Sequence, residues 1–180
     1  SYRGLLEHLD ADATIIGFEA PGFSGTGKTF ASVEALAEAY AEALRGLPGE
    51  AKITLCGWSF GGMVAHELGR LLEMGGRVAN VVMIDTSAPG LWPHPDLDHD
   101  LKVQWMWFAY IHLGEENVED IFGNDEFWTL SHDERLSQIG SAIRSKSYRD
   151  TTGRPPPELS VEELRVRFAC IQGLARAIGT

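Results

Sequence analysis

The sequence has few cysteines, no long apolar run and little positive charge, and each scarcity argues against a class of protein. Its only cysteines, Cys56 and Cys170, lack metal-site spacing. They cannot build a disulfide scaffold, so we expect a reducing, cytoplasmic location. No apolar run is long enough to span a bilayer, and no signal peptide is recognisable. Lysine and arginine total 15 against 26 acidic residues, a net charge of −11, which argues against nucleic-acid or membrane partners.

The size and composition are those of one globular domain. The 180 residues are enough chain to bury a core, and 44% of them are hydrophobic and 23% charged. In the first half, short apolar runs alternate with stretches in which apolar residues recur at helical spacing. Strands are predicted at 14–18, 53–57 and 78–84, and helices at 2–10, 33–44 and 63–72. This alternation predicts an α/β fold with a doubly wound, mainly parallel sheet. The run at 78–84 barely alternates, which is typical of a strand covered on both faces.

After Pro89 the pattern becomes helical, with segments predicted at 102–113, 131–146 and 160–177. A helical insertion after a strand commonly forms a lid over a site at the sheet edge. We therefore expect an α/β core at residues 1–90, a helical lid at 91–160 and a further helix within 161–180. The Trp, Met and Phe side chains of 102–113 are equally suited to core packing and to lining a pocket.

The stretch Gly57-Trp58-Ser59-Phe60-Gly61-Gly62 stands between a predicted strand and a predicted helix. That context is the one a nucleophile elbow requires. Glycines around a serine on a tight turn remove Cβ atoms that would clash, so its hydroxyl can stand clear of the strand. The pattern predicts Ser59 as a catalytic nucleophile and the N–H of Phe60 as an oxyanion donor. The alternative is a flexible Gly/Ser loop.

A serine nucleophile needs a histidine as base and a carboxylate that orients the histidine. Asp85 ends the apolar run after the elbow helix, so we expect it at the same sheet edge as Ser59. Its alternative role is to cap the turn at Thr86. No histidine is well placed: His66 lies about 10 Å along the elbow helix from the serine, and His94 and His99 are only the least poor candidates. His8, His112 and His132 are expected on the surface or in the lid.

A rival motif lies upstream. Gly22-Phe23-Ser24-Gly25-Thr26-Gly27-Lys28-Thr29 fits the phosphate-binding P-loop, and Asp85 could then serve as a magnesium-side aspartate. In a P-loop the helix should open at the Lys-Thr pair, but here Phe30 and Ala31 precede the expected helix cap at Ser32. The alternatives to a serine enzyme are thus a nucleotide-binding protein and a non-catalytic binding module.

The first 90 residues resemble the thioesterase domains that end nonribosomal peptide synthetases and modular polyketide synthases. The resemblance is carried by five stretches: Ser1–Leu5, Ile16–Gly22, Ser32–Ala37, Gly57–Gly62 and Met83–Thr86. Less distinctively, Leu164–Ile178 resembles the helix by which family members return to the core. The resemblance implies an α/β-hydrolase fold with a helical lid, and a catalytic acid at Asp85.

It also implies a function. Ser59 would take an acyl or peptidyl chain from the phosphopantetheine thioester of a carrier protein and release it by hydrolysis or macrocyclisation. No cofactor or metal would be bound directly, because the carrier delivers the substrate. In the family, a first strand with the second oxyanion donor precedes the position of Ser1, and the catalytic histidine follows that of Thr180. We therefore expect a partial domain that is cut at both ends.

Overall fold

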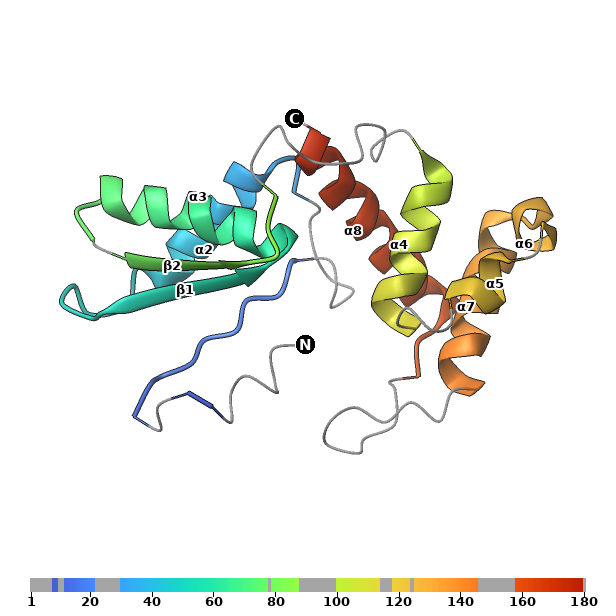
Figure 1. Ribbon diagram of the computed structural model, residues 1–180, viewed down its shortest axis with the longest axis horizontal. Coiled ribbons are helices and arrows are strands. Elements are labelled where there is room, and N and C mark those ends of the chain that lie inside the picture. The colour runs from blue at the N-terminus through green and yellow to red at the C-terminus, as the bar shows by residue number, and fades with distance from the viewer. Residues whose placement is uncertain are drawn as a thin grey trace.

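The computed structural model describes residues 8–9, 12–21, 30–77, 79–87, 100–113, 118–123, 125–145 and 158–179. These residues form an α/β unit and a helical unit that lie next to each other, with helix α8 nearest to the α/β unit (Figure 1). The fold is thus mixed α/β, as the alternating pattern of the first half predicts. None of the described helices is both long enough and apolar enough to cross a membrane.

The α/β unit contains two parallel strands and two helices. They are α2 (Val33–Leu44), β1 (Ile53–Trp58), α3 (Phe60–Met74) and β2 (Ala79–Ile84). The strands pair in register from Ile53 opposite Ala79 to Trp58 opposite Ile84. Both strands therefore end at the same edge, which points toward the helical unit (Figure 1).

Local sequence accounts for the boundaries of the two helices. Ser32 caps α2, and its hydroxyl accepts a hydrogen bond from Ala35 N–H at 3.2 Å. This contact satisfies one of the amides that a helix start leaves open. Gly75 and Gly76 end α3, Gly76 with a φ of 78° that glycine adopts readily. The apolar stripe of α3 packs on Leu55 of β1 and on α2 to form the first core, whose buried members are Val33, Leu36, Ala37, Leu44, Leu55, Met63, Val64, Ala65, Leu68 and Leu72.

Two predictions for the sheet are wrong. Residues 13–20 are not a strand, and Ile15 and Ile16 are 50% and 48% exposed. A strand exists only by pairing, and the described residues offer this segment no sheet neighbour; Phe18 instead stacks on Tyr40 of α2. Among the described residues, strand β2 is covered on one face only, because α3 packs against Val81 whereas Val82 and Ile84 remain exposed.

The helical unit is built from five helices: α4 (Leu101–Leu113), α5 (Val118–Phe122), α6 (Glu126–Thr129), α7 (His132–Ser145) and α8 (Val161–Gly179). The three longer helices match the predicted segments closely. Its core combines aliphatic and aromatic side chains, and within it Trp105 stacks on Phe168 with ring centroids 4.0 Å apart. Leu174 of α8 packs against both cores, so α8 joins the two units. The domain boundaries proposed from the sequence stay a prediction.

Candidate functional site

Ser59 occupies a strained turn between β1 and α3. Its φ of 53° and ψ of −123° lie where L-residues are rarely found. Its N–H donates to Ile84 O at 2.8 Å, which ties the turn to the end of the neighbouring strand. A Cβ at Gly57 would overlap the carbonyl of Gly61, so only glycine fits two residues before the serine. The strand–turn–helix geometry expected of an elbow is therefore present.

The N-terminus of α3 begins directly after the serine. Phe60 is the first helical residue, and the first amides of a helix have no acceptor within it. Together with the helix dipole, such amides favour negative charge beside the turn. The Ser59 hydroxyl makes no capping bond to the helix. The local field at Ser59 thus suits an oxygen on which negative charge develops.

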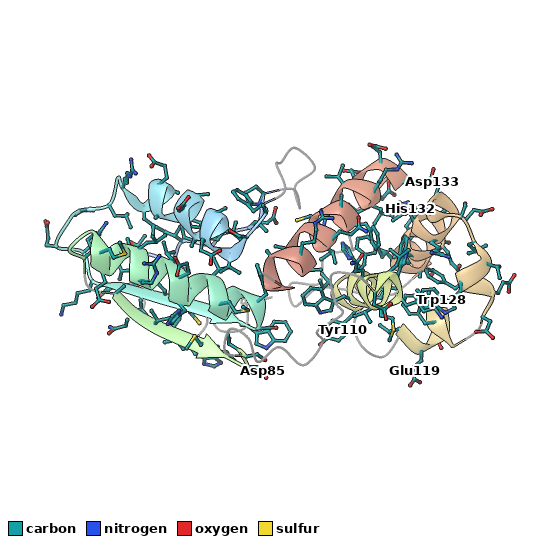
Figure 2. All side chains as sticks on the ribbon, turned by 90° about the horizontal axis from the view of Figure 1, so that it is seen from above. Asp85, Tyr110, Glu119, Trp128, His132 and Asp133 are labelled. Carbon is teal, nitrogen blue, oxygen red and sulfur yellow. The ribbon has the colours of Figure 1, made fainter. Side chains whose placement is uncertain are left out.

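Asp85 lies at the same sheet edge as Ser59. It follows β2 by one residue, and the last residue of that strand, Ile84, pairs with Trp58 immediately before the serine. Asp85 also has a positive φ, 50°, and its side chain is exposed. Figure 2 shows Asp85 at the end of the α/β unit that is nearer to the helical unit, with Tyr110 of α4 across from it. The sequence-based expectation that one edge carries both residues is met in position; their catalytic roles stay predictions.

Thr86 is a residue whose contacts sequence reasoning missed. Its hydroxyl lies 3.1 Å from Ser59 O and 3.2 Å from Ile84 O, within donating distance of both. The only signal in the sequence is Gly62, a third glycine that the Gly-x-Ser-x-Gly pattern does not demand. A Cβ on Gly62 would overlap the Thr86 hydroxyl. Sequence alone could not connect two positions so far apart in the chain.

The histidines of the described residues lie away from the two turns. His66 is exposed on α3, about two turns after Ser59. His112 Nδ1 lies 2.8 Å from Phe108 O within α4, and burial lowers the pKa of its imidazole. His132 packs its ring against Trp105 and Phe168. His94 and His99 lie outside the described residues.

The aromatic stripe of helix α4 serves core packing, and pocket lining stays a prediction. Trp105, Phe108 and Ala109 are fully buried in the core of the helical unit. On other faces of the same helix, Leu101, Met106, Tyr110 and Ile111 are exposed. A helix that is apolar nearly all round thus anchors the unit on one side and presents an apolar surface on the other. Exposed apolar surface of this kind is typical of binding sites.

The rival nucleotide site gains no support from the described residues. Residues 22–29 lie outside them, but α2 begins at Val33, four residues after Thr29, where a P-loop helix would begin at Lys28 and Thr29. In the part of the chain that the structure describes, no group of three or more His, Cys, Asp or Glu side chains is arranged to hold a metal ion.

Comparison with known proteins agrees with the elbow. The family model "Thioesterase domain" matches residues 1–158. Malpibaldin synthetase of Mortierella alpina is 36% identical over 88 residues, 48% of this chain and 2% of that protein. Orsellinic acid synthase ArmB of Armillaria ostoyae is 42% identical over 79 residues, 43% and 4% of the two chains. The non-reducing polyketide synthase crz7 of Cladonia metacorallifera is 33% identical over 86 residues, 47% and 4%. This chain therefore spans a few per cent of the length of the relatives it matches.

A solved structure shares the fold. The crystal structure of a holo four-domain nonribosomal peptide synthetase bound to AMP and glycine superposes with a TM-score of 0.74. The match covers 99% of this chain and 13% of that protein at 22% sequence identity. Both units of the present structure are therefore included in the match.

Proposed function

This chain belongs to the thioesterase domain family, and we propose that it releases an acyl or peptidyl chain from the phosphopantetheine thioester of a carrier protein. Its similarity to nonribosomal peptide synthetases and non-reducing polyketide synthases supports a carrier-bound substrate. In this proposal the two units are the core and lid of an α/β-hydrolase fold. Such a domain binds no cofactor of its own, because the phosphopantetheine arm comes with the substrate.

The proposed chemistry starts at Ser59. Its oxygen attacks the thioester carbonyl while a histidine outside the described residues accepts the hydroxyl proton. The tetrahedral oxyanion is stabilised by the Phe60 N–H and a second donor, and each such donor typically contributes about 3 kcal/mol. Collapse breaks the C–S bond, and the histidine returns the proton to the carrier thiol. Asp85 orients the histidine and stabilises its charged form.

Release completes the cycle in one of two ways. Water, or an amine or hydroxyl of the chain itself, attacks the acyl-serine carbonyl, its proton passes to the histidine and then to Ser59, and a free acid or a macrocycle leaves. Exclusion of water favours the macrocycle. The exposed apolar residues of α4, which include Met106 and Tyr110, supply a surface against which an acyl chain can lie.

The observation that carries this proposal is the backbone of Ser59. A positive φ on a serine costs on the order of 1–3 kcal/mol and persists only where its surroundings enforce it. Here Gly57, the Ile84 carbonyl and the start of α3 all hold the turn. A strained serine backbone beside a helix N-terminus, at the same sheet edge as an acid, supports nucleophilic catalysis better than a binding loop.

The test uses the full-length protein that carries this domain and octanoyl-N-acetylcysteamine thioester as the probe. Ser59→Ala should lower kcat/KM by about a thousandfold or more, and Asp85→Asn should also lower it strongly. Ser145→Ala is the matched control, since that exposed hydroxyl only bonds Ala142 O at the end of α7. Turnover that survives Ser59→Ala would refute the proposal. A wild-type protein that binds the thioester without turnover would support the non-catalytic alternative.

A further inference from the structure

The two residues of the described chain that have a positive φ and are not glycine are Ser59 and Asp85, at 53° and 50°. Each comes just after a strand, and the two strands are paired neighbours. Every such conformation costs about 1–3 kcal/mol and must be held by its surroundings. The Asp85 turn must therefore be held beside the Ser59 turn by contacts with its neighbours.

A small ring of hydrogen bonds joins the two turns. Ser59 N–H donates to Ile84 O at 2.8 Å, and the Thr86 hydroxyl is within donating distance of both Ile84 O and Ser59 O. A hydroxyl carries one proton, which these two carbonyls share or exchange. Ile84 and Thr86 flank Asp85 on both sides. The backbone of Asp85 is thus fixed at each end to the same residue, Ser59.

The first turn of α3 is shaped to accept this arrangement. Gly62 N–H donates to Ser59 O at 2.9 Å, so the serine carbonyl is held by the helix as well as by Thr86. A Cβ at Gly62 would overlap the Thr86 hydroxyl and lie 2.9 Å from its Cβ. The side chain of Thr86 therefore fills the space that glycine leaves open. Gly62 and Thr86 form a complementary pair across 24 positions of the chain.

From these contacts we propose that Thr86 is a positioning residue, whose hydroxyl fixes the turn of Asp85 against the turn of Ser59. The inference rests on the proposed function, since it matters only if Ser59 and Asp85 act together. Thr86 itself touches no reacting atom. Its effect is to keep the Asp85 carboxylate at the distance and direction that the proposed histidine requires. Misplacement of a catalytic group by about 1 Å can lower a rate by about a hundredfold.

The test compares Thr86→Val, which keeps the shape and removes the hydroxyl, with Thr86→Ser, which keeps the hydroxyl. In the full-length protein with the octanoyl thioester, Thr86→Val should lower kcat by about 10- to 100-fold with KM within about twofold. Thr86→Ser should stay within about threefold of wild type. Thr129→Val is the matched control, because the Thr129 hydroxyl also bonds a backbone carbonyl, Glu126 O at 2.7 Å, but in the helical unit. A Thr86→Val variant with wild-type kcat, or a Thr86→Ser variant as slow as Thr86→Val, would overturn the inference.

A double-mutant cycle separates positioning from a general loss of structure. The measured quantity is the rate at which a fluorophosphonate labels Ser59. If Thr86 acts through Asp85, the double variant Asp85→Asn/Thr86→Val should label less than twofold more slowly than Asp85→Asn alone. Full additivity of the two effects would contradict this. The proposed function is judged separately, on the wild-type protein: failure of wild-type labelling at Ser59 refutes that proposal, whereas equal labelling of wild type and Thr86→Val refutes only the role of Thr86.

Discussion

Trp105 of α4 and Phe168 of α8 stack face to face, with ring centroids 4.0 Å apart and an interplanar angle of 26°. Phe108 meets the same phenyl ring edge-on at 5.3 Å. These contacts join residues of two helices that lie 63 and 60 positions apart in the chain. They make the helical unit a packed body with a core of its own.

Phe168→Ala should remove the centre of that body. The side chain is 1% exposed, and truncation of a buried phenylalanine typically costs about 3–5 kcal/mol of unfolding free energy. Met106→Ala on α4 is the control, because Met106 is 44% exposed and its loss should cost under about 1 kcal/mol. Urea unfolding followed by tryptophan fluorescence measures both. Equal destabilisation by the two variants would show that the aromatic core does not hold the unit together.

Gly57→Ala should disturb the elbow directly. The added methyl would overlap the Gly61 carbonyl, so the turn must open and the Ser59 hydroxyl must move. We expect the rate of fluorophosphonate labelling to fall by at least about tenfold. Gly46→Ala, where a Cβ would meet nothing within 4 Å, should label at the wild-type rate. An unchanged rate in Gly57→Ala would mean that the turn tolerates a side chain there.

Cys170 should resist alkylation until the solution is strongly alkaline. Burial, and next the negative charge of Glu19, raise the pKa of its thiol to about 11, and its S–H points to Pro21 O at 3.8 Å. Because the thiolate is the nucleophile, iodoacetamide at pH 8 should modify the exposed Cys56 and spare Cys170. Mass spectrometry of wild type and Cys56→Ser measures this. Rapid modification of Cys170 at pH 8 would contradict the burial.

The same pKa predicts the direction of a pH effect on stability. The folded state holds the Cys170 proton more tightly than the unfolded state, whose thiol pKa is near the ordinary 9.0. The stabilisation that the raised pKa of Cys170 contributes to the unfolding free energy is therefore fully present below pH 9. It is lost as the pH rises from about 9 to about 11. Cys170→Ala should show a smaller loss over this interval, measured by urea unfolding at each pH. An identical pH dependence in the two proteins would show that Cys170 contributes none of it.

Much of the fold could be predicted because its signals are local. The spacing of apolar residues identifies α2, α3, α4, α7 and α8 to within a few residues, and Ser32 marks the start of α2 through its own hydroxyl. The run from Ile53 and the run that ends at Ile84 become paired strands as predicted. In each case, the information lies within the element itself.

The failures concern properties that depend on distant neighbours. Ile15 and Ile16 have the composition of a strand, but a strand requires a pairing partner that no local pattern encodes. The short helices α5 and α6, of five and four residues, have too few turns to show a period. At the site, the Gly-x-Ser-x-Gly pattern predicted the tight turn at Ser59, whereas the contact of Thr86 with the serine carbonyl is visible only in the folded chain.

If the hydroxyl of Ser59 is the nucleophile, as proposed, a reagent that modifies activated serines should attach to this residue. The full-length protein is treated with a fluorophosphonate, digested, and its peptides are sequenced by mass spectrometry. We expect one adduct within this domain, on Ser59, that disappears in Ser59→Ala and persists in Ser145→Ala. An adduct on another residue of the domain, or labelling unchanged by Ser59→Ala, would contradict it.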